Sequence, residues 1–132
     1  MRLGLVLVLS TGCYDPILGQ PVGGDTEVVT GFPGDVEAVF SASCAGSGCH
    51  WGGSMNPKLS EGYDSVVGVA SSAGPEYIVA GDASASYLVA KLKGTHTDLG
   101  GSGSQMPLGT PLTEAEIATI TAWVDAGAVR EE

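Results

Sequence analysis

The sequence predicts an all-α domain of three to four short helices joined by long loops. Three segments, at 35–44, 82–94 and 113–127, carry apolar residues at helical spacing together with residues that begin or end helices. No two segments alternate apolar and polar residues as a pair of strands would. Stretches rich in Gly, Ser, Asn and Pro separate the helical segments and predict the long loops.

Length and composition favour one domain with a core poor in large side chains. A chain of 132 residues suits a single domain. Glycine contributes 21 residues and aromatic residues only 6%, so few large side chains are present to fill a core. This composition is compatible with a large apolar cofactor at the centre of the domain, and also with a flexible, loop-rich fold.

The chain is strongly acidic. Its 15 acidic and 5 basic side chains give a formal net charge of −10. Such a chain offers no basic patch, so we expect no binding to nucleic acid or to an anionic membrane surface. We interpret the charge as a solubilising surface, with a specific basic partner as the alternative.

The amino terminus resembles a bacterial export signal. One basic residue precedes an apolar run at 3–9, which is too short to span a bilayer as a helix and is typical of a signal peptide over 1–12. The tetrapeptide STGC at 10–13 is similar to the cleavage box of bacterial lipoproteins, although serine stands where that box usually has leucine. The sequence therefore predicts export to the periplasm or cell envelope, with a lipid on Cys13 as membrane anchor. An ordinary secretory peptide is the alternative.

A lipid on Cys13 would account for the odd number of cysteines. Three cysteines in an exported chain leave one unpaired, and with Cys13 lipidated, Cys44 and Cys49 remain as a local pair. Residues 13–34 contain three prolines and five glycines and show no sustained period. We therefore expect this segment to be a lipid anchor and flexible tether, with the folded domain at 35–132.

The first predicted helix leads directly to the cysteine pair. Asp35 can cap it, because Pro33 and Gly34 break the chain just before. Three apolar side chains then fall on one helical face: Val36, Val39 and Phe40. The run continues to Cys44, so the cysteine pair lies at the carboxyl end of this helix.

The second predicted helix follows a loop at 51–60 and a short amphipathic segment at 62–70. Asp82 or Ser84 can cap this helix, and Gly94 closes it. Its larger side chains repeat at helical spacing: Tyr87, Leu88, Lys91 and Leu92.

The last predicted helix has the clearest signals. It follows a second loop, at 95–111, and begins with a capping box formed by Thr113 and Glu116. Gly127 ends it. Its apolar residues repeat at three and four: Ile117, Ile120, Trp123 and Val124.

The stretch CAGSGCH carries the chemistry. Covalent attachment of haem needs two thiols that reach the two vinyl groups of one porphyrin, and a histidine that reaches the iron from the same side. The familiar spacing is Cys-x-x-Cys-His, whereas Cys44, Cys49 and His50 give Cys-x4-Cys-His. We expect Gly46 and Gly48 to absorb the two extra residues, since glycine tolerates positive φ.

Two other interpretations of this stretch stay open. A disulfide between Cys44 and Cys49 would close a small loop in an exported protein. A zinc site could combine these thiols with His50 and His96, although the usual paired spacing of zinc ligands is missing.

Met106 is the candidate for a second axial ligand. Methionine opposite histidine raises the reduction potential of a haem, and Met106 stands in a polar loop where Pro107 favours an extended backbone. As the alternative, methionine also fills gaps in cores. Met55 is too close to His50 in sequence to reach the opposite face of the iron easily. His96 is a rival sixth ligand, or else a solvated loop histidine.

The motifs, taken in their order along the chain, resemble those of a class I (mitochondrial-type) cytochrome c domain. The first helix ends in CAGSGCH, a Pro-x-Leu unit follows at 57–59, and Met106 precedes a terminal helix. The stretches at 78–94 and 106–128 are also similar to the planctomycete-type branch of that family. The resemblance covers residues 35–129, and the wide cysteine spacing and the absence of an aligned basic face depart from it.

This resemblance implies a cofactor site and a small cytochrome c fold wrapped around one haem. The two cysteines would bind one haem c covalently, and His50 and Met106 would ligate its iron. The Pro57 carbonyl would accept a hydrogen bond from the other ring nitrogen of His50, and Leu59 would pack on the porphyrin. Candidate walls of the site, each equally an ordinary core residue, are Phe40, Leu59, Leu88, Leu92, Leu99 and Trp123.

The expected function is electron transfer by an exported monohaem c-type cytochrome between an unidentified donor and an unidentified acceptor protein. We expect no enzymatic activity of its own, since both axial positions would be filled, although the chain could be a subunit of a redox enzyme complex. One alternative is a sensor or catalytic haem protein in which a small ligand displaces Met106. The other is a haem-free, disulfide-stapled envelope lipoprotein that acts as a binding module.

Overall fold

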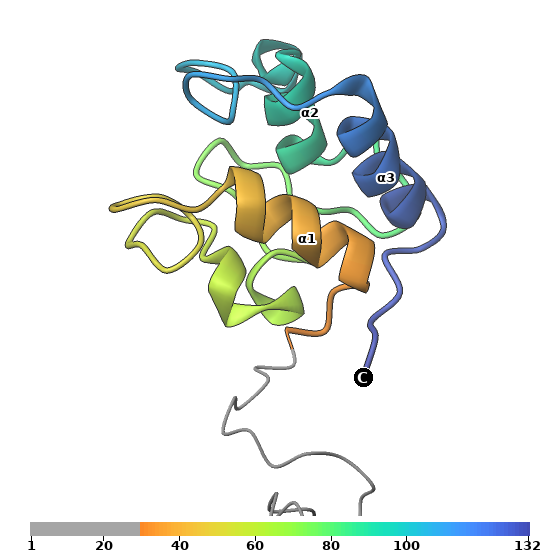
Figure 1. Cartoon of the computed structure of the whole chain (residues 1–132). Helices are drawn as coiled ribbons and strands as arrows, with labels where there is room; N and C mark the ends of the chain where they lie inside the picture. Colours follow the sequence, from red (N-terminus) through yellow and green to blue (C-terminus); the bar gives the residue numbers. More distant parts are fainter. Residues whose placement is uncertain (1–29) are drawn as a thin grey trace, which may run out of the picture.

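The computed structural model describes residues 30–132, in which three α-helices and long loops surround one core (Figure 1). The helices are α1 (Gly34–Ser43), α2 (Tyr87–Lys93) and α3 (Glu114–Asp125), and three short 3-10 helices lie in the loops: η1 (Leu59–Glu61), η2 (Tyr63–Ser65) and η3 (His96–Leu99). Residues 30–132 contain isolated β-bridges and no strand, so the all-α prediction is confirmed. The predicted signal peptide, Cys13 and most of the predicted tether lie outside the described residues. Within the described part, no helix has the length and apolar character that a membrane crossing needs.

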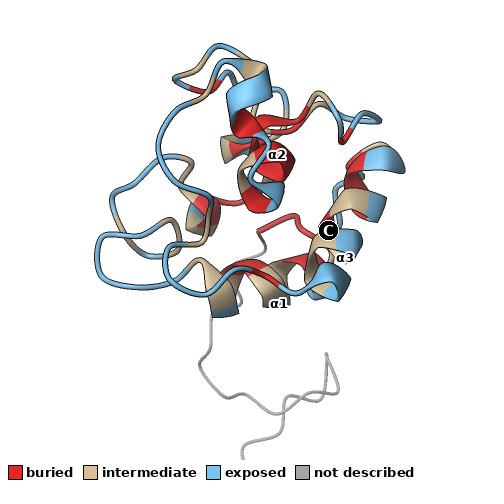
Figure 2. Cartoon of the chain, turned by 90° about the horizontal axis from the view of Figure 1, so that it is seen from above, coloured by how far each residue is buried: buried red, intermediate tan, exposed pale blue. Residues whose placement is uncertain are grey.

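The core joins all three helices. α3 packs against both α1 and α2, and Figure 2 shows the buried residues concentrated on the inward sides of the helices. The most deeply buried apolar side chains come from the helices and from the loops between them: Val36, Phe40, Val66, Ile78, Val89, Ile120 and Val124. Because burial of apolar surface is the main stabilising term, this core fixes the carboxyl end of α1 relative to α2, and these two elements border the candidate site.

The packed domain begins before the predicted boundary at 35. Thr30 and Phe32 are buried. The Phe32 ring lies edge-on to the rings of Phe40 and Trp123, with centroid distances of 5.1 and 5.7 Å. Edge-to-face aromatic pairs add to the free energy of apolar burial. Aromatic packing therefore draws the end of the predicted tether into the core.

α1 begins at Gly34, with Pro33 at the N-cap position and no side-chain cap. The prediction that Asp35 caps this helix is wrong. Asp35 lies in the first turn instead, where a carboxylate interacts favourably with the helix dipole. At the other end, the amide of Cys44 donates to the carbonyl of Phe40 at 2.9 Å, so the helix delivers Cys44 at its carboxyl end as predicted.

α2 is shorter than predicted. It begins at Tyr87, and neither Asp82 nor Ser84 caps it. Asp82 caps the preceding turn, where its Oδ1 accepts hydrogen bonds from the Ser84 hydroxyl (2.6 Å) and the Ala85 amide (3.0 Å). Gly94 ends the helix as predicted, in the left-handed region at φ +76°.

α3 has the predicted capping box. The Thr113 hydroxyl oxygen accepts from the Glu116 amide (3.3 Å), and the Glu116 carboxylate accepts from the Thr113 amide (2.7 Å). The hydrogen bonds from the amide and hydroxyl of Thr113 lower the pKa of the Glu116 carboxyl. α3 ends at Asp125, shortly before Gly127 adopts φ +105°.

Candidate functional site

A cavity of about 340 Å³ lies between the carboxyl end of α1, one side of α2 and the loops that follow both helices. Five of the six predicted site residues line this cavity: Cys44, His50, Pro57, Leu59 and Met106. The sixth, Cys49, is exposed on the loop and lies outside the lining. The fold therefore brings the predicted histidine and methionine, which are far apart in the sequence, to one space.

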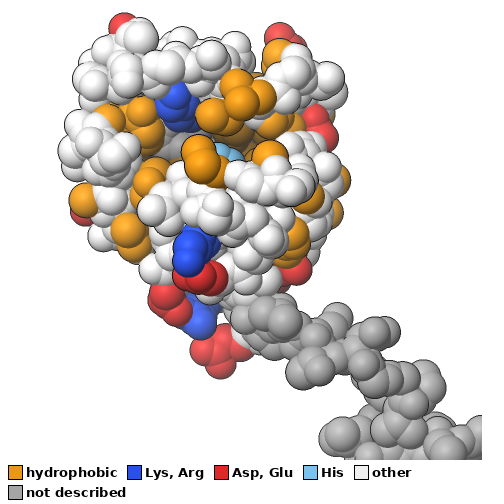
Figure 3. All heavy atoms as spheres, turned by 90° about the vertical axis from the view of Figure 1, so that its left-hand side faces the viewer, with side chains coloured by type: hydrophobic (Ala, Val, Ile, Leu, Met, Phe, Trp, Pro, Cys, Tyr) orange, Lys and Arg blue, Asp and Glu red, His pale blue; other side chains and the backbone are white. Residues whose placement is uncertain are grey.

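The surroundings of the cavity are apolar and free of negative charge. Figure 3 shows a hollow rimmed by hydrophobic side chains, with a histidine inside it and a basic side chain at its edge. Among the lining residues the histidine is His50 and the basic residue is Lys91. No acidic residue of the described chain lines the cavity. In a protein with a net charge of −10, the acidic side chains are thus kept away from this site.

The wide cysteine spacing forms a closed loop at the end of α1. Gly46 and Gly48 have φ of +143° and +82°, so the expectation that these two glycines absorb the extra residues is confirmed. The Cys44 carbonyl accepts hydrogen bonds from the amides of both His50 (3.2 Å) and Trp51 (3.1 Å). These two bonds return the chain to the helix end after the loop.

A glycine that sequence reasoning missed supports this loop. A Cβ atom on Gly53 would overlap the backbone nitrogen and oxygen of Cys49, so only glycine fits there. The sole sequence signal for this close approach is the pair of adjacent glycines at 52–53. Gly53 thereby allows the next turn to pack directly on the cysteine loop.

His50 is held from two sides. Its Nδ1 lies 3.0 Å from the Pro57 carbonyl oxygen. Because a carbonyl only accepts, Nδ1 carries the proton and Nε2 is left with a lone pair. The His50 carbonyl in turn accepts from the amide of Leu59, at 2.8 Å. The hydrogen bond that the family resemblance implies between His50 and Pro57 is present.

Cys44 and Cys49 are both free thiols. Burial, and to a smaller extent the neighbouring Cys49, raises the pKa of the Cys44 thiol from 9.0 to about 11. Cys44 faces the cavity whereas Cys49 is exposed. The disulfide considered as an alternative is not formed in this structure.

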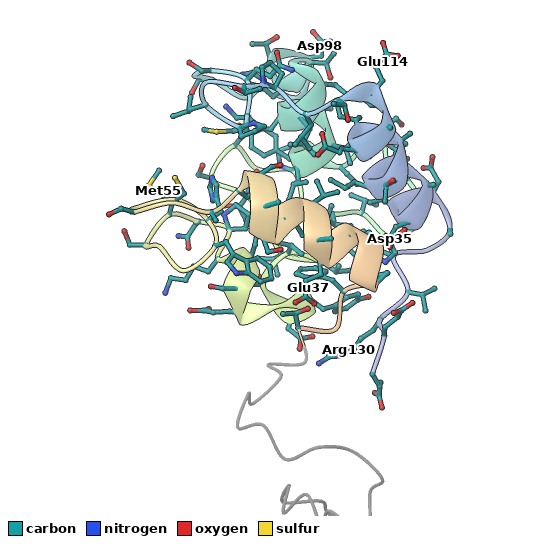
Figure 4. All side chains as sticks on the ribbon, in the orientation of Figure 1. Asp35, Glu37, Met55, Asp98, Glu114 and Arg130 are labelled. Carbon is teal, nitrogen blue, oxygen red and sulfur yellow. The ribbon has the colours of Figure 1, made fainter. Side chains whose placement is uncertain are left out.

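Two methionines line the cavity. Met106 comes from the loop before α3, and Met55 comes from the loop after His50. Met55 is 52% exposed. Figure 4 places it at the edge of the molecule that faces the viewer in Figure 3. Sequence proximity to His50 argued against a role for Met55, yet the cavity offers two thioether sulfurs together with the His50 imidazole.

His96 lies outside the cavity. The expectation of a solvated loop histidine is wrong, since His96 is only 4% exposed. Its Nε2 lies 2.9 Å from the Gly103 carbonyl oxygen, and its Nδ1 is buried without a partner. His96 is not among the lining residues, which argues against a role as sixth ligand.

Within residues 30–132, no three His, Cys, Asp or Glu side chains gather as a metal site, so the zinc interpretation gains no support.

Four of the six predicted walls line the cavity, namely Phe40, Leu59, Leu88 and Leu92, whereas Leu99 and Trp123 do not. Trp123 packs in the core against Phe32. Sequence reasoning missed Tyr77 as a lining residue, and it gave Tyr87 and Lys91 only as periodic positions of α2. Tyr87 and Lys91 are four residues apart on α2, so their side chains lie on one helical face. This spacing is the signal that could have identified both as lining residues.

Comparisons with known proteins return no match, whether with family models, curated proteins or solved structures. The side chains that line the cavity are therefore the basis for a functional assignment.

Proposed function

We propose that this chain is a monohaem c-type cytochrome of the class I kind, which carries single electrons between redox proteins. The observation that carries this proposal is the convergence of one imidazole and a thioether on the same apolar cavity. His50 and Met106 both line it, Cys44 stands beside them, and the Pro57 carbonyl fixes the His50 tautomer. An apolar cavity with few polar groups is what a large flat cofactor requires.

Three of the four donors expected for haem c line the cavity: Cys44, His50 and Met106. The fourth, Cys49, is exposed and lies outside the lining. The thiols of Cys44 and Cys49 would hold the haem as thioethers. His50 would present Nε2 to the iron, because its Nδ1–H is donated to the Pro57 carbonyl. Met106 would present its sulfur, and histidine with methionine is a ligand pair of electron-carrying cytochromes. When bound, the haem iron supplies a one-electron couple.

Apolar side chains form much of the remaining cavity wall, and no acidic residue of the described chain lines it. Phe40, Leu59 and Leu92 are almost fully buried and form apolar walls. Low polarity and the absence of carboxylates around a redox centre disfavour additional positive charge on it. His50 and Met106 would both hold the iron, which favours electron exchange over a bond-making reaction at this site. Electron exchange with a donor and an acceptor protein is then the activity that the site supports.

Mass spectrometry of the denatured protein tests the proposal. After expression together with a cytochrome maturation system, we expect the mass of the chain plus one haem. The variant Cys44→Ala/Cys49→Ala should lose the adduct. Cys13→Ser, a matched change of the third cysteine, should keep it. A chain that carries no haem under these conditions refutes the proposal.

The same preparation separates the two alternatives. Binding of carbon monoxide by the reduced protein at a rate close to that of an open iron site would favour the sensor interpretation. Absence of haem together with an intact Cys44–Cys49 disulfide would favour the envelope binding module. Export and a lipid on Cys13 are proposed from the sequence alone, and the mass of the mature membrane-associated chain tests both.

A further inference from the structure

We propose that Lys91 and Gln105 form a latch that positions Met106 over the cavity. The latch, defined as these two side chains, ties the loop before α3 to the carboxyl end of α2. Its role toward an iron ligand rests on the proposed function, whereas the latch as a loop-fixing device does not.

Lys91 bonds the loop through its side chain and its backbone. Its Nζ donates to the carbonyls of Ser102 (2.7 Å) and Ser104 (3.0 Å). Its own carbonyl accepts from the amide of Met106 at 3.0 Å. An ammonium group carries three donors, and hydrogen bonds from a charged donor are stronger than neutral ones. Lys91 thus binds the segment that contains Met106 through three hydrogen bonds.

Gln105 adds a bond from the loop side. Its Nε2 donates to the Leu92 carbonyl at 2.7 Å. The side chain crosses Gly94, where a Cβ atom would lie 3.0 Å from the Gln105 Oε1 and where φ is +76°. The left-handed backbone favours glycine at this position, and a Cβ atom there would also press against the Gln105 side chain.

The geometry explains why these contacts form. The last four carbonyls of a helix have no partner within the helix. In α2, two of these carbonyls belong to Lys91 and Leu92, and the loop satisfies both, through the Met106 amide and the Gln105 side chain. Gly94 is the C-cap of α2, and the loop before α3 supplies the partners of two of the last carbonyls of the helix, so the position of Met106 follows from the end of that helix.

Two further contacts fix the other end of the loop. His96 Nε2 donates to the Gly103 carbonyl at 2.9 Å. Gly101 lies against the ring of Tyr87, where a Cβ atom would be only 2.6 Å from the ring carbon and the hydroxyl oxygen. With the loop tied down on both sides, the Met106 side chain reaches the cavity from a fixed backbone.

Competition by an external ligand tests this role. In the oxidised holoprotein, imidazole competes with Met106 for the iron, so its apparent affinity reports how firmly Met106 is held. Lys91→Met removes both side-chain hydrogen bonds at nearly constant side-chain length. We expect imidazole to bind about tenfold more tightly to this variant, the size expected from loss of hydrogen bonds by a charged donor. Gln105→Met should change the affinity in the same direction.

Lys93→Met is the matched control. It removes the same charge from the same helix, and Lys93 makes no side-chain hydrogen bond among the described residues. We expect the control to bind imidazole as the unaltered holoprotein does. Equal affinities for the Lys91 and Lys93 variants would overturn the positioning role.

Amide hydrogen exchange gives a readout that needs no haem. In Lys91→Met, exchange at 102–106 should accelerate, including the Met106 amide, while exchange within α3 stays unchanged. Unchanged exchange at 102–106 would refute the latch itself. A chain that lacks haem but shows the accelerated exchange would refute only the proposed function, so the two failures can be told apart.

Discussion

Alkylation of the two site cysteines is the most direct test of the packing at the end of α1. The haem-free chain, with Cys13→Ser to leave two thiols, is treated with iodoacetamide over a range of pH. Only the thiolate reacts. With the pKa of Cys44 raised from 9.0 to about 11, the thiolate fraction at pH 8 falls from about 9% to about 0.1%.

The expected difference in rate follows from two opposing effects. The smaller thiolate fraction slows Cys44 about 100-fold relative to the same thiol in the unfolded chain, while the greater nucleophilicity of a more basic thiolate speeds it about tenfold. The net effect is about tenfold slower alkylation of folded Cys44 at pH 8, before any steric shielding. Cys44 in urea is the control, and peptide mass spectrometry gives the rate at each cysteine.

The pH profile is more specific than the rate at one pH. The rate at folded Cys44 should rise about tenfold per pH unit from 8 to 10 and level off near pH 11, whereas in urea it should level off near pH 9. A plateau near pH 9 in the folded chain contradicts the buried position of Cys44. Protection of both cysteines that disappears with a reductant supports a Cys44–Cys49 disulfide instead.

Other substitutions probe the scaffold. Thr113→Ala removes the α3 cap and should lower the free energy of unfolding by about 1 kcal/mol in urea titrations. The folded-state pKa of Glu116 is lowered, so its contribution to the free energy of unfolding is present above the ordinary glutamate pKa and is lost as pH falls. The urea midpoint should therefore drop on acidification more in the unaltered chain than in Glu116→Gln. Phe40→Ala empties a fully buried position beside the cavity and should cost about 3–5 kcal/mol. Arg130→Met breaks an exposed ion pair with Asp64 and should leave the thermal midpoint unchanged.

Local signals in the sequence predicted two helix ends correctly, but they did not predict where the packed domain begins. The capping box of Thr113 and Glu116 and the helix end at Gly94 depend on neighbouring residues only, and the structure confirms them. The start of the packed domain depends on a contact between Phe32 and Trp123, which no local pattern records. Proline and glycine near Phe32 indicated a tether, and long-range aromatic packing outweighed that signal.

At the candidate site, too, contacts between residues close in sequence could be predicted, whereas contacts between distant segments could not. His50 and Pro57 are close in sequence, and their hydrogen bond could be anticipated from the motif. The contacts of Lys91 and His96 with the loop at 102–104 join segments that only the tertiary fold brings together. Sequence reasoning therefore identified Lys91 only as a periodic position of the second helix, and His96 as a rival sixth ligand or a solvated loop histidine. No spacing rule in a sequence identifies the carbonyl acceptors of such side chains.

The Cys-x4-Cys-His spacing shows why a count of intervening residues is a weak guide to such a site. The proposed donor set needs, besides the two thiols, a histidine that returns to the end of the helix that carries the first cysteine. The Cys44 carbonyl secures this return by accepting from the amides of His50 and Trp51. Positive φ at Gly46 and Gly48 lets the inserted residues bulge away from the return point. In this chain the Cys44 carbonyl and the two glycines thus keep His50 at the end of α1 despite the two extra residues.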